Sequence, residues 1–376
     1  MVVVEYIWAV KSICIFVSND LATDQRMIRI SEWLVHHEWK VHLVATLKPG
    51  SLAFSGNGYT IERLDIRPRN GIFFYLILNV IFFTKTIFSS YQAYLAVDLD
   101  TLPGIRLATW ISRKKLIWDC HEIYPSIPEL YSKPLIRGFW NRVERLFLPG
   151  LKQIIAVNIG VCDHLKKFGL SPQIVHNYPV MRQLIGTIRE RFDSKIILFQ
   201  GHLNEGRCLD TLILMVGNLP PAFTLCIAGD GHLKNQLMTL TDKAWLQDRV
   251  RFLGMLAPDD LFEVTSRAFL GISLLEGRHE NSRISLANKN LDYIMAGLPS
   301  ITMNFPEYRL INNRWEVSIL LDDPVQSAYL ESEIIKLSED YDRYVKMHFA
   351  CLQAREVLNW GHESDKLSVI FESMQA

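Results

Sequence analysis

The sequence predicts an α/β protein made of two Rossmann-like, doubly wound domains that face each other across a cleft. Short β-branched runs alternate with segments of helical period, which is typical of parallel sheets with right-handed crossovers. The chain has 376 residues, which exceeds the usual size of one compact domain. Two domains of ordinary size are therefore expected.

The expected strands follow from the β-branched runs. They are SICIFVS, KVHLVAT, AYLAVDL, KKLIWDC and QIIAVN in the first half, and KIILFQG, TLCIAGD, RVRFLGM and LGISLLE in the second. Thr23 is expected to cap the first crossover helix, because Met27, Ile30 and Leu34 then share one helical face.

A turn-rich and charged segment at residues 175–195 is the expected hinge. We therefore expect an N-terminal domain over residues 1–183 and a C-terminal domain over residues 184–354. Strand signals stop after about residue 325, and the rest of the chain has helical periodicity.

Composition excludes some classes of protein. The 40 basic and 40 acidic residues balance, which argues against binding of nucleic acid. The six scattered cysteines form no CxxC pair and are expected to be buried in a reducing compartment. The apolar start contains Glu5 and Lys11 and lacks a cleavage site, which favours a first strand over a signal peptide.

The most apolar stretch of the chain begins at Ile72. It is interrupted only by Asn79 up to Phe83 and is followed by Lys85, so it is shorter than the roughly 20 residues of a spanning helix. We favour a helix buried against a sheet, as in many parallel-sheet proteins. The alternative is a helix that makes peripheral membrane contact through residues 72–88.

One strand end in the first half carries titratable groups. The strand KKLIWDC leads into His121 and Glu122, and ligands of α/β folds bind at such strand ends. His121 is expected to contact a sugar or the acceptor hydroxyl. The alternative is a solvated loop without a role.

Two strand ends in the second half carry glycine turns. Gly201, Gly206 and Arg207 follow one strand, and Gly229 and Gly231 follow the next. Glycine lets the backbone approach a phosphate, and an arginine neutralises it. Either turn alone is a weak signal, because connections in α/β units commonly use glycine.

The segment SLANKNLDYIMAGLPSI at 285–301 is expected to be a helix with a binding face. Asn288 and Asp292 are four residues apart on that face, and Lys289 is three residues before Asp292. A helix N-terminus with a lysine attracts a diphosphate, and a carboxylate one turn deeper can accept both hydroxyls of a ribose. The alternative is a surface ion pair between Lys289 and Asp292.

An Asp-x-Asp motif lies at residues 97–101, in VDLDT. Such a pair can ligate a divalent metal in other sugar transferases, but a lone pair in an extended segment without a partner ligand does not indicate a metal site. No metal ligands are therefore predicted.

The order of these motifs resembles the retaining glycosyltransferases of the GT-B fold, the group often called family four, nearly end to end. GHLNEGRCLDTLI resembles the phosphate-binding turn of that family, IAGDGHLKNQL its second glycine loop, and ANKNLDYIMAGLPSI the helix that holds the donor nucleotide. In the first half, NDLATDQRMIRISEWL and WDCHEIYPSIPEL resemble the opening loop and a His-acid strand end. LNWGHESDKLSVIF resembles the last helix, which in this fold crosses back to the first domain, here over residues 355–376.

The resemblance implies a nucleotide-diphosphate-sugar donor held by the second domain, an acceptor held by the first, and neither a cofactor nor a required metal. Asp292 would bind the ribose, and Arg207 with Lys289 the diphosphate. The other expected donor contacts are Gly201, His202, Gly229, Gly231, Asn281 and Asn288.

The second half departs from the family pattern at two positions. His202 stands where an arginine is usual, so charge on the diphosphate depends on pH or on Arg207. Ile284 stands where the paired acidic motif has its first glutamate, and Glu280 or Asn281 is then expected to contact the sugar.

The first loop also departs from the pattern, because it lacks the glycine pair of many relatives. Asn19, Asp24 and Arg26 are expected to position the acceptor or a phosphate. A helix cap and a surface ion pair explain these residues equally well.

The sequence therefore predicts a cytoplasmic, membrane-peripheral and metal-independent hexosyltransferase. It would move a sugar to a glycan or a lipid-linked acceptor during surface polysaccharide assembly, although a fold alone does not fix a function. One alternative is a glycosyltransferase-like binding subunit without turnover. The other is a GT-B epimerase or hydrolase of the nucleotide sugar, with His121 or Glu122 as acid-base.

Overall fold

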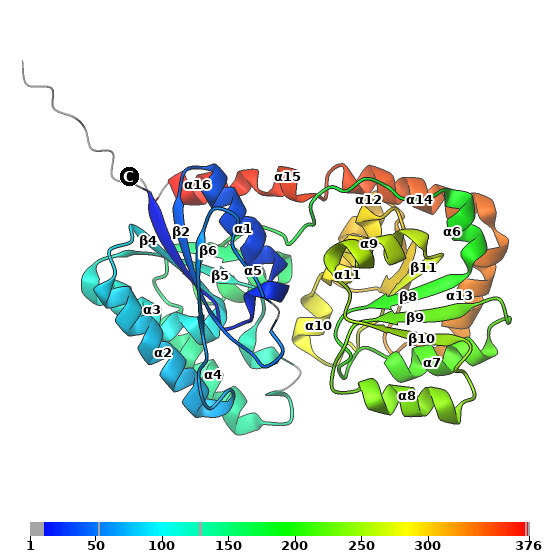
Figure 1. Ribbon diagram of the computed structural model, residues 1–376, viewed down its shortest axis with the longest axis horizontal. Coiled ribbons are helices and arrows are strands. Elements are labelled where there is room, and N and C mark those ends of the chain that lie inside the picture. The colour runs from blue at the N-terminus through cyan, green and yellow to red at the C-terminus, as the bar shows by residue number, and fades with distance from the viewer. Residues whose placement is uncertain (1–10, 52, 128–129, 373, 375–376) are drawn as a thin grey trace, which may run out of the picture. The chain divides into compact units, whose positions relative to one another are not determined.

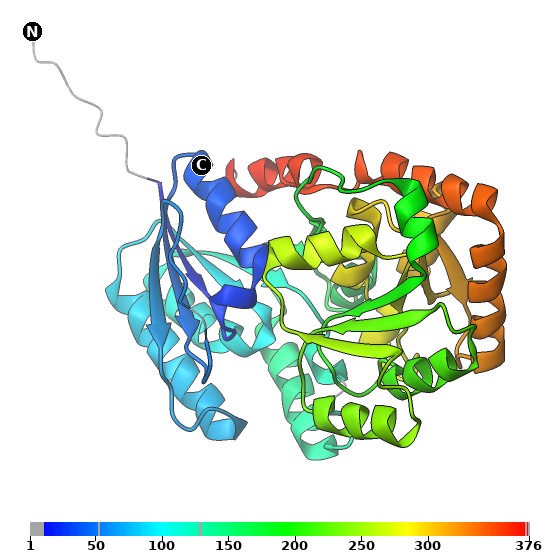
Figure 2. The same cartoon turned by 45° about the vertical axis from the view of Figure 1, so that its right-hand side comes forward.

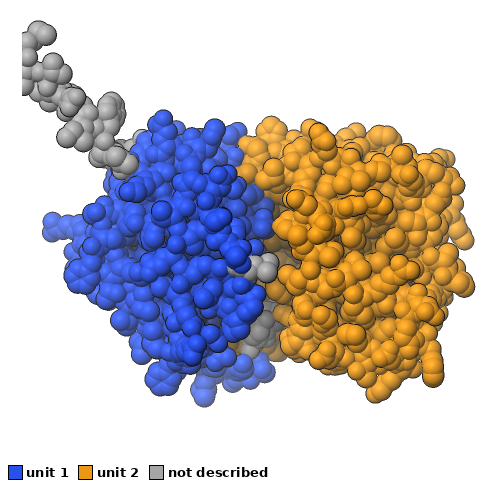
Figure 3. All heavy atoms as spheres, in the orientation of Figure 1, with its two compact units in different colours: residues 1–126, 132–176, 364–376 blue, residues 127–131, 177–363 orange. Residues whose placement is uncertain are grey.

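A computed structural model describes residues 11–51, 53–127, 130–372 and 374. The chain divides into two compact units, coloured separately in Figure 3. Unit 1 comprises residues 1–126, 132–176 and 364–376, and unit 2 comprises residues 127–131 and 177–363. The apolar start of the chain, which is expected to open the first strand, lies outside the described residues up to residue 10.

Unit 1 contains a parallel seven-stranded sheet in the order β3-β2-β1-β4-β5-β6-β7. The reversal of strand order at β1 and β4 is the doubly wound arrangement, in which ligands bind at the carboxyl ends of the strands. The strands are β1 (Ser12–Phe16), β2 (Lys40–Thr46), β3 (Thr60–Leu64), β4 (Ala93–Val97), β5 (Lys115–Cys120), β6 (Gln153–Ala156) and β7 (Gln173–Ile174).

Helices cover both faces of this sheet. Figure 1 shows α1 and α16 on one face and α2 and α3 on the other. Trp33 of α1 contacts the ring of Phe371 in α16, with ring centres 5.8 Å apart. The helices of unit 1 are α1 (Gln25–His36), α2 (Gly71–Phe88), α3 (Asp98–Ser112), α4 (Pro134–Phe147), α5 (Ile159–Lys166) and α16 (Asp365–Glu372), with short 3-10 turns η1 (Leu21–Thr23) and η2 (Tyr124–Ser126).

The first crossover helix begins one residue later than expected. Residues Leu21–Thr23 form η1, and α1 is capped by Asp24, whose carboxylate accepts a hydrogen bond from the backbone N–H of Met27 at 3.1 Å. The prediction of Thr23 as the cap is therefore wrong, because the 3-10 turn occupies that position. The predicted face is confirmed, since Met27, Ile30 and Leu34 are all fully buried.

Helix α2 is buried on one side only. Phe74, Leu78 and Phe82 pack inward, whereas the opposite side leaves a row of large apolar side chains exposed. The expected burial against the sheet is therefore found for one face only, since Phe82 contacts Phe16 of β1 while 22% of the helix is buried. Within the described residues, α2 is the one helix that by length and composition is long and apolar enough to cross a membrane.

Unit 2 repeats the architecture with a parallel six-stranded sheet in the order β10-β9-β8-β11-β12-β13. Its strands are β8 (Ile196–Gln200), β9 (Thr224–Ala228), β10 (Val250–Gly254), β11 (Leu270–Ser273), β12 (Ser300–Met303) and β13 (Ser318–Leu321). Figures 1 and 2 show α7 and α8 on one face of the sheet and α9 and α11 on the other.

The helices of unit 2 connect these strands and then close the unit. They are α6 (Ile188–Ser194), α7 (Leu209–Asn218), α8 (Lys234–Lys243), α9 (Pro258–Arg267), α10 (Glu280–Ile284), α11 (Asn288–Met295), α12 (Pro306–Arg314), α13 (Ser327–Glu339), α14 (Tyr341–Arg355) and α15 (Trp360–Glu363). The two sheets confirm the predicted fold class of two Rossmann-like α/β domains.

Candidate functional site

The two glycine loops of unit 2 meet backbone to backbone at the carboxyl ends of β8 and β9. A Cβ atom on Gly229 would lie 1.9 Å from the carbonyl oxygen of Gly201, and one on Gly231 would lie 2.5 Å from that of Leu203. The backbone N–H of Gly201 donates to Ala228 O at 2.9 Å. Only glycine permits this approach, which fixes the loop after β8 against its neighbour.

Lys289 is buried beside this loop. Its side chain is 6% exposed, and its Nζ lies 3.7 Å from the ring centre of Phe199. A Cβ atom on Gly201 would be 3.7 Å from the same Nζ. Among the described residues, this ammonium has no hydrogen-bond partner.

The electrostatics of Lys289 disfavour its own charge. Burial, and then the neighbouring guanidinium of Arg207, lower the pKa of Lys289 well below its usual value. A bound anion would reverse both effects, because it supplies hydrogen-bond acceptors and opposite charge. The alternative of a surface ion pair between Lys289 and Asp292 is wrong, since the lysine is neither exposed nor hydrogen-bonded.

Asp292 lies one turn deeper in α11 and is oriented by a polar chain. Gln200, at the end of β8, donates from Nε2 to Asp292 Oδ2 at 2.8 Å. The hydroxyl of Thr265 in α9 donates to Gln200 Oε1 at 3.0 Å, which fixes the orientation of the amide. Asn288 is exposed at the start of α11 and accepts a hydrogen bond from Asn177 at 2.9 Å.

The structure thus brings together most of the expected donor contacts. Gly201, Arg207 and Lys289 are neighbours, and Asp292 is linked to the residue that precedes Gly201. His202 is exposed on the same loop.

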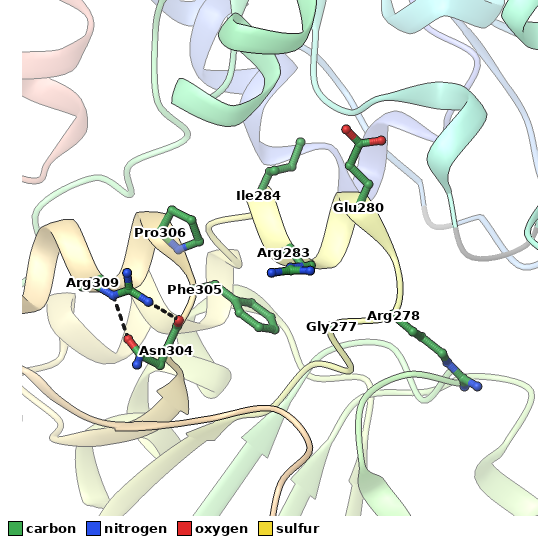
Figure 4. Close-up of a pocket in the computed structure, with 9 residues that line it drawn as sticks. All are labelled: Gly277, Arg278, Glu280, Arg283, Ile284, Asn304, Phe305, Pro306 and Arg309. Carbon is green, nitrogen blue, oxygen red and sulfur yellow. Dashed lines mark hydrogen bonds between the residues drawn. The ribbon is translucent and has the colours of Figure 1, made fainter.

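Glu280, one of the two residues expected to contact the sugar, lines a separate cavity of unit 2, of about 590 Å³. Figure 4 shows that Glu280 and Ile284 project from one side of α10 and Arg283 from the other. Arg207, Lys289 and Asp292 do not line this cavity, whose walls are Gly277, Arg278, Glu280, Arg283, Ile284, Asn304, Phe305, Pro306 and Arg309. Asn281 lies in α10 and does not line it either.

His121 lies in unit 1, at the end of β5, within a buried network of charges. Arg26 donates two hydrogen bonds to Asp119, from Nε to Oδ2 and from Nη2 to Oδ1, each at 2.9 Å. His121 Nε2 lies 3.0 Å from Asp119 Oδ2, and its Nδ1 lies 3.5 Å from Asp98 Oδ2. Neither the solvated loop nor the surface ion pair considered for these residues is found, because Arg26 and Asp119 are buried.

The network keeps His121 protonated. Burial opposes the charge of the imidazolium, but the carboxylates of Asp98 and Asp119 outweigh burial and raise the pKa of His121 to about 9. Burial also opposes the charge of Asp119, but Arg26 and His121 outweigh it and hold the pKa of Asp119 well below its usual range. The imidazolium is thus a fixed donor at neutral pH.

The expectation that the acidic pair of VDLDT lies in an extended segment is wrong. Asp98 and Asp100 do not lie in an extended segment but begin α3, and both are buried. Asp98 has a positive φ of 61° and accepts a hydrogen bond from the backbone N–H of His121 at 2.8 Å. The signal that was present in the sequence is their position directly after a strand of the sheet.

Known proteins resemble this chain at two levels, through a family model over part of it and through solved structures over nearly all of it. Residues 183–349 match the family model described as glycosyl transferases group 1. A sucrose-phosphate synthase from Thermosynechococcus elongatus superimposes with a TM-score of 0.79 at 14% identity, over 97% of this chain and 99% of the other. The chain has the GT-B fold, and its residues 183–349 match glycosyl transferases group 1.

Other solved structures share this GT-B fold. HepE of Anabaena, in complex with UDP and glucose, superimposes with a TM-score of 0.73 at 15% identity, over 96% of this chain and all (100%) of the other. The lipopolysaccharide outer core galactosyltransferase WaaB gives a TM-score of 0.62 at 12% identity, over 96% and 99%. None of the curated proteins compared with this chain matches it in sequence.

Proposed function

We propose that the chain is a retaining, metal-independent hexosyltransferase that moves a sugar from a nucleoside-diphosphate sugar to a glycan or a lipid-linked acceptor in surface polysaccharide biosynthesis. The observation that carries this proposal is the buried ammonium of Lys289, which lies beside Gly201 and Arg207 without a hydrogen-bond partner among the described residues. A buried charge of this kind is costly unless a ligand completes it.

The donor diphosphate is the ligand whose chemistry fits best. Its oxygens would accept from Lys289, from Arg207 and from backbone amides of the loop after β8, while the N-terminus of α11 adds its dipole. Gly229 and Gly231 allow the second loop to lie close to the first. His202, Asn281 and Asn288 remain candidate contacts of the donor.

The nucleoside is assigned to Asp292. Its carboxylate is a double acceptor for the 2′- and 3′-hydroxyls of a ribose, and the hydrogen bond from Gln200 fixes its orientation. HepE of Anabaena was crystallised with UDP and glucose, which supports a nucleotide donor for this chain as well.

The transfer step needs no protein nucleophile. In our proposal the acceptor oxygen attacks C1 of the donor sugar on the face from which the diphosphate departs, so the configuration at C1 is retained. The new C1–O bond forms as the C1–O bond to phosphate breaks, and the acceptor proton passes to a phosphate oxygen. The charges of Arg207 and Lys289 stabilise the leaving diphosphate. His121, in unit 1, is assigned to the acceptor hydroxyl.

The location of the enzyme is also part of the proposal. The exposed apolar side of α2 supports peripheral attachment at the inner face of a membrane, with the enzyme in the cytoplasm. The part of the chain that the structure describes has its six cysteines unpaired, which suits a reducing compartment.

The test is product analysis with a panel of UDP-, ADP-, GDP- and dTDP-hexoses in the presence of a chelator. NMR of the product formed with an acceptor should show the same anomeric configuration as the donor. Inversion at C1, or loss of activity with the chelator, would contradict the proposal. Release of free or epimerised sugar without an acceptor would instead indicate a hydrolase or an epimerase, and nucleotide binding without turnover would indicate a binding subunit.

A further inference from the structure

Unit 1 contains a second pocket, which the donor site does not use. It has a volume of about 190 Å³ and lies where β1, β4 and β5 end. This is smaller than the roughly 300–1,000 Å³ of a site for a drug-sized ligand, so it suits one monosaccharide unit. Its charged lining residues are Lys48, Arg69, Asp98, Asp100 and Glu122.

The most buried charged group in the lining of this pocket is the carboxyl group of Asp100, which the side chains of Ser18 and Tyr124 contact. Asp100 is 3% exposed, and its Oδ2 accepts a hydrogen bond from the hydroxyl of Tyr124 at 3.3 Å. Its Oδ1 is buried without a hydrogen-bond partner in the described part of the chain. Burial, and then the charge of Asp98, raise the pKa of Asp100 to about 7. The group can therefore accept from, or donate to, a sugar hydroxyl.

The rim of the pocket has the opposite charge. Lys48 follows β2, and Arg69 precedes the first turn of α2. Asn70 is the N-cap of this 18-residue helix but makes no side-chain hydrogen bond to it. Two cations and the uncapped N–H groups of a long helix favour a phosphate at the rim, away from the carboxyl groups of the floor.

A stripe of exposed apolar side chains begins directly at this rim. Ile72 and Phe73 are each 65% exposed, Leu76 is 59% exposed and Val80 is 55% exposed. Residues 72, 76 and 80 share one face of α2 and extend over about 12 Å of helix. Hydrocarbon could cover this stripe while remaining linked to a phosphate at the rim.

We propose that unit 1 binds a lipid-phosphate-linked monosaccharide as the acceptor. The sugar occupies the acidic pocket, the phosphate lies at Lys48, Arg69 and the first turn of α2, and the hydrocarbon follows Ile72, Leu76 and Val80. The order of the three chemical groups along the ligand matches the order of the three surfaces along the protein. This assignment rests on the proposed function and selects the lipid-linked acceptor over a soluble glycan.

The test is calorimetric titration of the full chain, without donor, with three probes. These are farnesyl-diphosphate-linked N-acetylglucosamine, N-acetylglucosamine 1-phosphate, and farnesyl diphosphate without a sugar. The complete probe should bind about tenfold or more tighter than either fragment, because it engages all three surfaces at once. Equal affinity for the complete probe and the sugar phosphate would overturn the proposal, and so would equal affinity for the two farnesyl probes.

Matched variants locate the phosphate and the hydrocarbon. Arg67 and Arg69 both pair with Asp65 on the surface, at 3.2 and 3.1 Å, but only Arg69 lines the pocket. Arg69→Ala should weaken binding of the complete probe about tenfold, and Arg67→Ala should leave it unchanged. Leu76→Ser should reduce the advantage of the farnesyl chain, whereas Phe88→Ser, at the exposed far end of α2, should not.

A UDP titration of each variant separates this proposal from the proposed function. All four variants should bind UDP as the parent does, since each lies in unit 1. If the parent binds the complete probe but does not bind UDP, the donor site alone is refuted. Equal effects of Arg67→Ala and Arg69→Ala would refute the acceptor assignment alone.

Discussion

Replacement of Lys289 by methionine should stabilise the unliganded protein and remove its affinity for nucleoside diphosphates. The lysine is 6% exposed and its ammonium has no hydrogen-bond partner among the described residues. A buried unsatisfied group costs about 1–3 kcal/mol, and more when it is charged. Methionine keeps the apolar stem and fills a similar volume.

The expected gain can be bounded from the contacts of the ammonium. Its position 3.7 Å from the ring centre of Phe199 stabilises it by about 0.5–2 kcal/mol, and the variant loses that contact. If the buried charge costs about 3 kcal/mol, a net gain of about 1–2.5 kcal/mol remains, which raises the melting temperature by roughly 2–10 °C for a unit of this size. The gain should shrink as the pH rises toward 10.5, the ordinary pKa of the lysine, because the neutral amine carries no such penalty.

The assay is scanning calorimetry of the parent and the variant without nucleotide, followed by titration with UDP. Lys243→Met is the control, because Lys243 is exposed in α8 of the same unit, and it should change stability by less than about 0.5 kcal/mol. A neutral or destabilising effect of Lys289→Met would refute the reasoning that this charge is unsatisfied. Undiminished binding of UDP by the variant would refute the role of the Lys289 charge in holding the diphosphate.

Two further predictions concern His121 and the glycine loops. The carboxylates of Asp98 and Asp119 raise the pKa of His121 to about 9, so its charge stabilises the fold fully below about pH 6.5, and this stabilisation is lost as the pH rises through 9. Urea denaturation should show the advantage of the parent over His121→Gln fall by about 3 kcal/mol from pH 6 to pH 10, and a constant difference would contradict this. Gly229→Ala places a methyl carbon 1.9 Å from a backbone oxygen and should cost about 3 kcal/mol or more. Gly206→Ala, with φ +78° and open space around the added methyl group, should cost only about 1–2 kcal/mol. Equal losses of unfolding free energy for the two variants in chemical denaturation would contradict a steric clash at Gly229.

The sequence predicts most of the strands, because each of these contains a β-branched run. The β-branched runs predicted β1, β2, β4, β5 and β6 in unit 1 and β8 to β11 in unit 2. The strand β3 was missed because TIERL is mostly polar and only half-buried. The strands β12 and β13 were not predicted, and β12 begins directly after the glycine turn at Gly297, where the expected helix ends.

The candidate site was predictable in its positions and less so in its contacts. Glycine turns and one helix were enough to locate Gly201, Arg207 and Lys289, because these lie at strand or helix ends where ligands bind. The sequence did not reveal that Lys289 is buried, or that Gln200 holds Asp292. Both depend on tertiary packing, which a one-dimensional pattern does not specify.

The most direct test of the account is the discrimination of a ribose by Asp292. UDP, ADP, GDP and CDP, each with its 2′-deoxy counterpart, should be titrated calorimetrically into the parent, Asp292→Ala and the exposed control Asp248→Ala. The parent and the control should bind at least one ribonucleotide about tenfold tighter than its deoxy form, and Asp292→Ala should bind more weakly without that preference. No binding of any nucleoside diphosphate to the parent, or an unchanged preference in Asp292→Ala, would contradict the account.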